Sequence, residues 1–171
     1  MKKQGFTLIE LMVVIVIMGI LAAVAVPKLF GMIAKSKASE VGPAAGTYVK
    51  LQQAYFSESL KAGGWQLIGY SAPGNSGLTT NFAYGMGSTI ASNTAVSVSG
   101  TPTVWVATNL ANLNECSGTA GTAGMNTSAA GPWKVTIQQG TGNANQDLIF
   151  DASVTGAGCQ ALTPSFDKIG K

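Results

Sequence analysis

The sequence predicts an α+β protein in which one long N-terminal helix packs against a C-terminal antiparallel sheet. Hydrophobic residues recur at helical spacing from the N-terminus to about Leu60, which predicts the helix. After Trp65 they instead alternate with polar residues in short runs, which Gly-, Pro- and Asn-containing turns separate. The chain has 171 residues, enough for one ordinary domain, so the sheet and part of the helix are expected to share one head.

The composition argues against enzymatic chemistry. Charged residues make up 10% of the chain, against roughly 25% in typical soluble domains. Histidine is absent and all ten basic residues are lysine, which excludes His-based catalysis, His zinc sites and arginine clamps. We expect no enzyme activity, no catalytic or metal site and no cofactor. The net charge of +3 falls to +1 without Lys2 and Lys3, so no nucleic-acid partner is expected.

The N-terminal part of the predicted helix is almost entirely apolar. Residues 11–26 contain no charged or strongly polar side chain, and from Phe6 onward only Thr7 and Glu10 interrupt the apolar stretch. As a helix this stretch is about 30 Å long, close to the thickness of a bilayer hydrocarbon core. The sequence therefore predicts an apolar membrane helix over residues 6–35 and a globular head over residues 36–171.

Two ordinary hypotheses account for such a segment. It is a cleaved secretory signal peptide, with Lys2 and Lys3 as its basic region and Ala23-Val24-Ala25 as its cleavage site, or a permanent anchor that the same lysines orient. Neither hypothesis has a use for Glu10, because a carboxylate near the start of a membrane helix costs about 1–3 kcal/mol. Intramembrane carboxylates normally mark a function.

A third interpretation rests on the residues around Glu10. Gly5-Phe6-Thr7-Leu8-Ile9-Glu10, after a short lysine-containing leader and before the apolar stretch, resembles the class III signal sequence of type IV pilins and type II secretion pseudopilins. The resemblance covers roughly the first 35 residues. It implies that prepilin peptidase removes the leader, residues 1–5, between Gly5 and Phe6, and methylates the new amino group of Phe6. It also implies that the helix holds the subunit in the inner membrane and later packs in a filament core.

The resemblance assigns Glu10 to filament assembly. Cleavage would place an ammonium group on Phe6, four residues before Glu10. In a bundle of identical, staggered helices, this positive terminus of one subunit can neutralise the Glu10 carboxylate of its neighbour. An alternative stays open, because residues four apart on a helix are also within reach of each other inside one chain.

An amphipathic helix is expected over about residues 36–61. Its predicted buried stripe consists of Ala34, Ala38, Val41, Ala45, Tyr48, Leu51 and Tyr55, and its opposite face carries Lys35, Glu40, Lys50 and Glu58. A left-handed cap is expected at Gly63-Gly64.

Bends are expected at four positions of the helix. Pro27 and the Gly42-Pro43 pair should bend or loosen it, because proline removes one hydrogen bond and clashes with the preceding turn. The resemblance further implies local unwinding between Gly19 and Pro27.

The rest of the chain is predicted to form a connecting loop over about residues 62–80 and strands over about residues 81–155, in the pilin-type roll that the resemblance implies. The alternating sets are Phe82, Tyr84 and Met86; Val96 and Val98; Val104 and Val106; Trp133, Val135 and Ile137; and Leu148 and Phe150. Residues 117–130 are low in complexity and are expected to form a surface loop.

Cys116 and Cys159 are the two cysteines of the chain. Their spacing excludes a C-x-x-C redox pair, and two thiols without histidine make a poor zinc site. They are either free buried thiols or one disulfide, and the disulfide is favoured if the head lies outside the cytoplasm. The resemblance implies the disulfide, because type IV pilins carry a C-terminal pair around a disulfide-bounded region, here residues 116–159.

The resemblance implies a structural subunit, the major pilin of a type IV pilus used for surface attachment or twitching motility. The chain would be a homopolymer on the bacterial surface, with prepilin peptidase, the pilus assembly platform and its ATPases as partners. One alternative is a type II secretion pseudopilin, although relatives of the major pseudopilin lack the cysteine pair and carry an acidic calcium loop. Another is a DNA-uptake pilin, which needs clustered cations, whereas the head's candidate lysines are isolated: Lys61, Lys134, Lys168 and Lys171.

Overall fold

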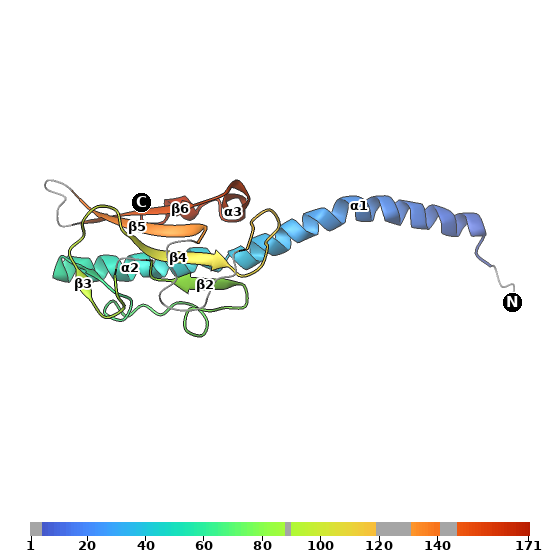
Figure 1. Cartoon of the computed structure of the whole chain (residues 1–171). Coiled ribbons are helices and arrows are strands. Elements are labelled where there is room, and N and C mark those ends of the chain that lie inside the picture. Colours follow the sequence, from blue (N-terminus) through green and yellow to red (C-terminus); the bar gives the residue numbers. More distant parts are fainter. Residues whose placement is uncertain (1–4, 88–89, 119–130, 141–146) are drawn as a thin grey trace.

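The computed structural model describes residues 5–87, 90–118, 131–140 and 147–171. Residues 1–4 of the predicted leader and most of the predicted loop at 117–130 lie outside this range. A helical spine, α1 (Leu8–Ala38) followed by α2 (Val41–Ser59), carries a head built on α2, and most of α1 projects from the head as a stem (Figure 1). The predicted α+β class is confirmed.

α1 runs without interruption through both Gly19 and Pro27. The unwinding that the resemblance implies between these residues is therefore not present in this structure, although the helix curves gently along its length (Figure 1). An apolar helix can tolerate one proline because it loses only the hydrogen bond of that residue's missing N–H, and its other backbone bonds remain.

The spine breaks between α1 and α2, at Ser39 and Glu40. Ser39 is four residues before Pro43, so its carbonyl is the one that the missing Pro43 N–H leaves without a helical partner and that the proline ring crowds. The Ser39 hydroxyl donates to the Ser36 carbonyl at 2.7 Å, which supports the last turn of α1. The interruption thus falls one turn before the Gly42-Pro43 pair.

The left-handed residue that ends α2 was predicted at the wrong position. Leu60, not Gly63-Gly64, takes the left-handed conformation, with φ of 53°, and its N–H donates to the Phe56 carbonyl at 2.8 Å. Gly63 instead belongs to a short strand, β1 (Ala62–Gly63). The buried Gln52 side chain holds that strand: in the amide orientation that satisfies both groups, it exchanges two 3.0 Å hydrogen bonds with the Gly63 N–H and carbonyl.

The main sheet is antiparallel and has four strands in the order β2-β4-β5-β6. These strands are β2 (Phe82–Gly85), β4 (Thr103–Asn109), β5 (Trp133–Gln139) and β6 (Leu148–Val154). They run alongside α2 (Figure 1) and match four of the five predicted alternating sets. The remaining set, Val96 and Val98, does not belong to the main sheet. Val96 lies in β3 (Ala95–Val96), which pairs with β1 in a separate two-stranded sheet.

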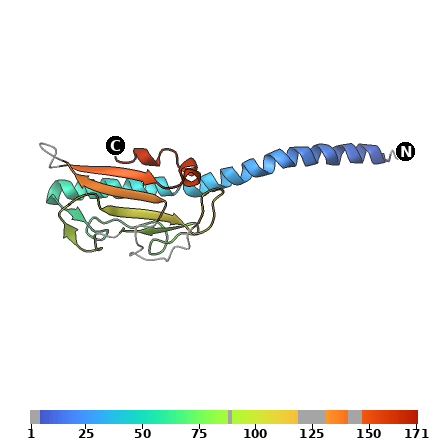
Figure 2. The same cartoon turned by 45° about the horizontal axis from the view of Figure 1, so that its top comes forward.

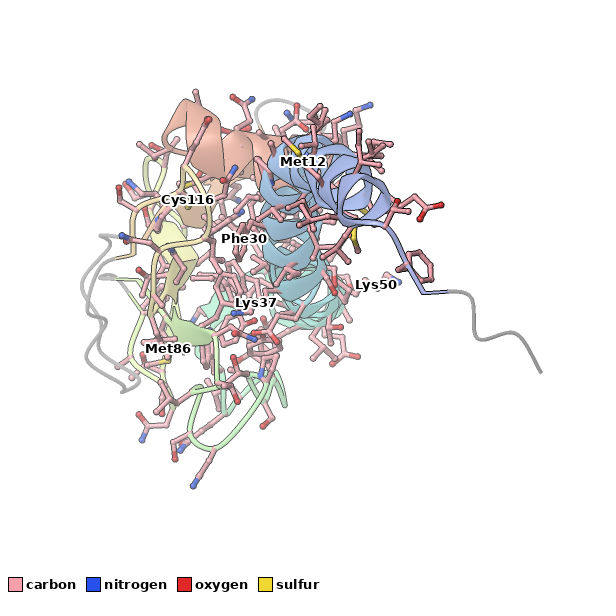
Figure 3. The ribbon with its side chains drawn as sticks, turned by 90° about the vertical axis from the view of Figure 1, so that its right-hand side faces the viewer. Met12, Phe30, Lys37, Lys50, Met86 and Cys116 are labelled. Atoms are coloured by element: carbon pink, nitrogen blue, oxygen red, sulfur yellow. A yellow bond between two sulfur atoms is a disulfide. The ribbon has the colours of Figure 1, made fainter. Side chains whose placement is uncertain are left out.

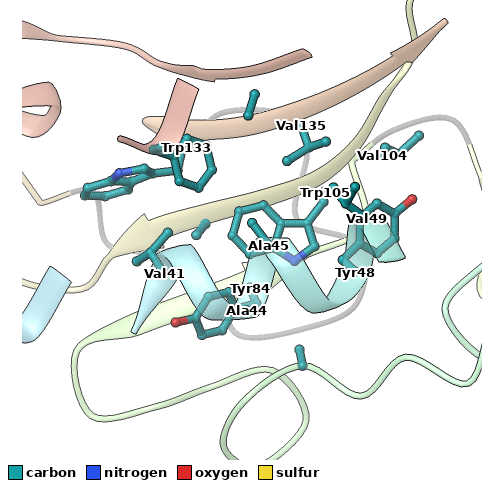
Figure 4. Close-up of a cluster of buried hydrophobic side chains, with 14 of the residues drawn as sticks. Val41, Ala44, Ala45, Tyr48, Val49, Tyr84, Val104, Trp105, Trp133 and Val135 are labelled. Carbon is teal, nitrogen blue, oxygen red and sulfur yellow. The ribbon is translucent and has the colours of Figure 1, made fainter. Parts of the chain in front are cut away.

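The core lies between α2 and the main sheet. The predicted stripe is correct as far as Tyr48, but beyond it Val49, Gln52 and Phe56 are buried, whereas Leu51 and Tyr55 are only half-buried. A regular helix repeats its inward face every three or four residues, and positions 45, 49, 52 and 56 keep that face, whereas positions 51 and 55 lie to one side of it. Trp105 of β4 faces Ala45 of α2 in this core (Figure 4).

The C-terminal segment was not predicted from the sequence. It forms α3 (Ala157–Leu162) and a short 3-10 helix, η2 (Phe166–Lys168), and α3 lies beside the junction of α1 and α2 (Figure 2). The Trp133 indole donates to the Thr163 hydroxyl at 2.7 Å, and the Phe166 ring stacks on Trp105 with centroids 6.1 Å apart. These contacts fasten the segment to the sheet.

Candidate assembly site

The stem presents an apolar surface that its own chain does not cover. No residue from Gly5 to Ile33 is buried, and large side chains remain 87% exposed at Phe6, 64% at Leu21 and 61% at Phe30. An exposed apolar surface of this extent is not stable in water, and covering each large side chain contributes about 1.5–3 kcal/mol. Lipid or other protein must therefore surround the stem. The helix that begins at Leu8 is also the one helix in the described residues that is long and apolar enough to cross a membrane.

Glu10 lies at the exposed end of this stem, where it takes part in a capping box. The Thr7 N–H and hydroxyl both donate to Glu10 Oε2, at 2.8 and 2.7 Å, and the Glu10 N–H donates to Thr7 Oγ1 at 3.3 Å. Sequence reasoning missed Thr7, although the spacing Thr-x-x-Glu is the known signal of this cap. The cap explains how the helix begins at Leu8, and it leaves the carboxylate on the outer surface.

The predicted pairing of Glu10 with an amine depends on cleavage of the chain. In the uncleaved chain the Phe6 nitrogen belongs to the peptide bond with Gly5 and carries no charge. A Cβ added at Gly5 would meet nothing within 4 Å, so nothing in the fold requires a glycine there. The reason for Gly5 must lie outside the folded chain.

Glu40 departs from its predicted place on a solvated helix face. It is half-buried at the break between α1 and α2, and its Oε1 accepts hydrogen bonds from the Thr79 hydroxyl at 2.6 Å and the Tyr84 hydroxyl at 3.0 Å. The break turns this residue toward the head, which helical spacing alone does not predict. Burial raises the pKa of Tyr84, and the charge and hydrogen bond of Glu40 raise it further, so the phenol stays a donor.

Cys116 and Cys159 form the predicted disulfide, with Cα atoms 4.5 Å apart. The bond joins the segment that follows β4 to α3, and both cysteines are buried. The buried Asn109 side chain supports this region, because its amide donates to the carbonyls of Ala111 at 3.0 Å and Cys116 at 3.2 Å. Figure 3 shows Cys116 in the view from the stem side of the head. Within the described part of the chain, no three His, Cys, Asp or Glu residues are close enough to share a metal ion.

The fold and the site define a class of protein. Its members have an apolar N-terminal helix long enough to cross a membrane, which carries a disulfide-bonded α+β head. The family described as "Prokaryotic N-terminal methylation motif" matches residues 1–26. The predicted resemblance to type IV pilins is confirmed by this motif and by relatives that carry pilin or fimbrial names.

Three of these relatives carry pilin or fimbrial names. The Type IV major pilin protein PilA of Myxococcus xanthus (strain DK1622) is 46% identical over 57 residues, or 33% of this chain and 26% of that protein. The Fimbrial protein EcpC of Eikenella corrodens is 46% identical over 56 residues, 33% of this chain and 37% of that protein. The Type IV major fimbrial protein FimA of Dichelobacter nodosus is 56% identical over 39 residues, 23% of this chain and 25% of that protein.

Each of these three matches covers a third of this chain or less, and the chain spans about a quarter to two fifths of the length of these relatives. No solved structure gives a significant match to the chain.

Proposed function

We propose that this chain is the structural subunit of a type IV pilus. The observation that carries the proposal is the exposed apolar stem with Glu10 at its end, on a head that buries its own core. A folded head needs no such appendage for stability. An anchor in the membrane uses the stem but not the carboxylate, whereas a helical bundle of identical stems uses both. The named relatives are type IV pilins and fimbrial proteins, which favours a pilin over a secretion pseudopilin.

Processing is the first step of the proposed function. Prepilin peptidase would cut between Gly5 and Phe6 and methylate Phe6, since the fold itself places no demand on Gly5. Intact-mass analysis of the mature protein should show loss of residues 1–5 and gain of one methyl group. A mature terminus at Val26, after Ala23-Val24-Ala25, would contradict the proposal and favour a cleaved secretory signal.

Assembly is the second step. A neighbour displaced by four residues along the stem, about 6 Å at 1.5 Å per residue, brings its Phe6 amine level with Glu10. A carboxylate without a partner in lipid costs one to several kcal/mol, and pairing with the amine recovers much of this free energy. Since 1.4 kcal/mol is tenfold in an equilibrium constant, this bias at each addition should decide whether a long polymer forms.

Two substitutions of Glu10 test this step. If the carboxylate recruits the next subunit, Glu10→Val should give a cleaved, membrane-held protein that enters filaments inefficiently. Glu10→Gln should do the same, although glutamine can still accept from Thr7 and keep the helix cap. Normal piliation in both variants, with cleavage confirmed by mass, would show that apolar packing alone drives assembly.

The remaining parts of the proposal concern location and partners. The subunit would wait in the inner membrane and then form a surface homopolymer for attachment or twitching motility, driven by the assembly platform and its ATPases. A role as a DNA receptor has little support in the described residues, because the head lysines are scattered and Lys171 lies 3.6 Å from Asp151.

A further inference from the structure

The neck of the stem, residues 28–38, carries positive charge without acidic partners. Lys28, Lys35 and Lys37 are exposed there, and no acid lies between Glu10 and Glu40 in the sequence. Among the described residues the one ion pair is Lys171–Asp151, far along the chain. Figure 3, viewed along the stem, shows Lys37 on the neck in front of the head. The neck lysines therefore have no acidic partner in their own described chain.

Glu40 lines a hollow beside the start of α2. The hollow has a volume of about 310 Å³, and its other walls include Pro43, Ala44, Tyr70 and Pro73. Thr47 and Ser71 complete the lining, and mostly apolar walls with one carboxylate suit a lysine side chain, which has an aliphatic stem and a charged end. Both hydrogen bonds that Glu40 accepts from the head go to Oε1. Oε2 receives neither of them, so a cation can approach this carboxylate without displacing the head contacts.

The spacing of these charges matches the stagger of the proposed assembly. Lys35 is five residues and Lys37 three residues before Glu40, or about 7.5 and 4.5 Å along a helix. Their mean is four residues, the same as the separation of Phe6 and Glu10, and the positive group comes first in both cases. One displacement of about 6 Å between parallel neighbours therefore brings Phe6 level with Glu10 and places Lys35 and Lys37 within about 1.5 Å of the level of Glu40.

We propose that the neck lysines Lys35 and Lys37 pair with Glu40 of neighbouring copies of this chain, seated at the hollow beside α2; the two lysines lie on opposite sides of the helix, so each meets a different copy. This inference rests on the proposed function as a filament subunit. It adds a contact outside the membrane, about 45 Å along the spine from the Phe6–Glu10 contact. Two charge contacts in the same register fix the axial stagger of the copies, because a slip along the stem separates both together. Apolar packing along the stem does not by itself select one register.

A crosslinking experiment in intact filaments separates contacts between copies from contacts within one chain. Cells would coexpress Glu40→Gln with the double variant Lys35→Gln/Lys37→Gln, and sheared filaments would be treated with a carbodiimide, which joins amines to adjacent carboxylates. In this mixture an amide bond from Lys35 or Lys37 to Glu40 can form only between two copies. The Lys171–Asp151 pair is the internal positive control.

We expect the bond between copies in the coexpressed filaments and its loss when either variant is expressed alone. Wild-type filaments that give the bond while the coexpressed filaments do not would show pairing within one chain and overturn the inference. Intact filaments that give the control bond but no bond to Glu40 would also overturn it. Wild-type cells without filaments of this chain would instead contradict the proposed function itself.

Filament yield gives a second measurement if the variants assemble poorly. Lys35→Gln/Lys37→Gln should lower the yield by about tenfold or more, and Lys35→Arg/Lys37→Arg should restore it, because arginine keeps the charge. Lys28→Gln is the matched control, since the same displacement places Lys28 level with Met32, where no acid lies. A loss that arginine does not rescue, or an equal loss for Lys28→Gln, would contradict charge pairing.

Discussion

Removing the Cys116–Cys159 crosslink should lower the free energy of unfolding of the head by about 4 kcal/mol. The bond closes a loop with a sequence separation of 43 residues, and the chain-entropy relation gives about 4 kcal/mol for a loop of that length. The appropriate variant is Cys116→Ala/Cys159→Ala, because both sulfur atoms are buried and alanine introduces no new polar group. The denaturant slope should also rise, since the unfolded chain without the crosslink exposes more surface.

Urea unfolding of the mature full-length chain in detergent micelles measures this change. Trp65, Trp105 and Trp133 all lie buried in the head and the stem has no tryptophan, so tryptophan fluorescence follows the head alone. Wild-type protein reduced before unfolding is the matched control, because it loses the crosslink but keeps the sulfur atoms.

The two outcomes of this comparison are distinct. If reduced wild type and the double alanine variant fall by similar amounts, the crosslink itself stabilises the head. A reduced wild type as stable as the oxidised protein would refute the loop-closure argument, and any loss in the alanine variant would then come from the missing sulfur atoms in the core.

Three further predictions concern the head and the break in the spine. Tyr70→Phe should lower the free energy of unfolding in urea by about 1–3 kcal/mol, because the buried Trp105 indole N–H, which donates to the Tyr70 hydroxyl at 3.0 Å, would lose its acceptor. A loss below about 0.5 kcal/mol would contradict this. Burial raises the pKa of Tyr70 from 10.0 to about 12, so head stability should be fully present below pH 10 and fall as the pH rises through 12. An absorbance change near pH 10 in the folded wild type that Tyr70→Phe removes would contradict this. Pro43→Ala restores an N–H opposite the Ser39 carbonyl, so hydrogen exchange should find the new amide at position 43 protected; rapid exchange there would show that the break has another cause.

The sequence predicts those features that depend on local pattern. The stem, the amphipathic helix and the strands from Phe82 to Phe150 follow from periodicity, because the period of burial is a property of neighbouring residues. The disulfide follows from the expected extracytoplasmic head and from the resemblance to pilins, because a separation of 43 residues does not by itself decide between a disulfide and free thiols.

The features that the sequence does not predict depend on contacts between distant segments. Glu40 has the spacing of a solvated residue, and only the break and the arrival of Thr79 and Tyr84 from 39 and 44 residues away make it half-buried. The left-handed Leu60 is similarly unexpected, because a glycine pair three residues later offers the conformation at lower local cost. Pairing of the next residues with β3 fixes where the helix ends.

The central claim is that this chain polymerises through its stem into a surface filament, and sheared surface material from the bacterium tests it most directly. Electron microscopy and intact-mass analysis of the same preparation should show long filaments composed mainly of this chain, each copy beginning at a methylated Phe6. Filaments composed of another protein, with this chain left in the membrane fraction, would contradict the claim.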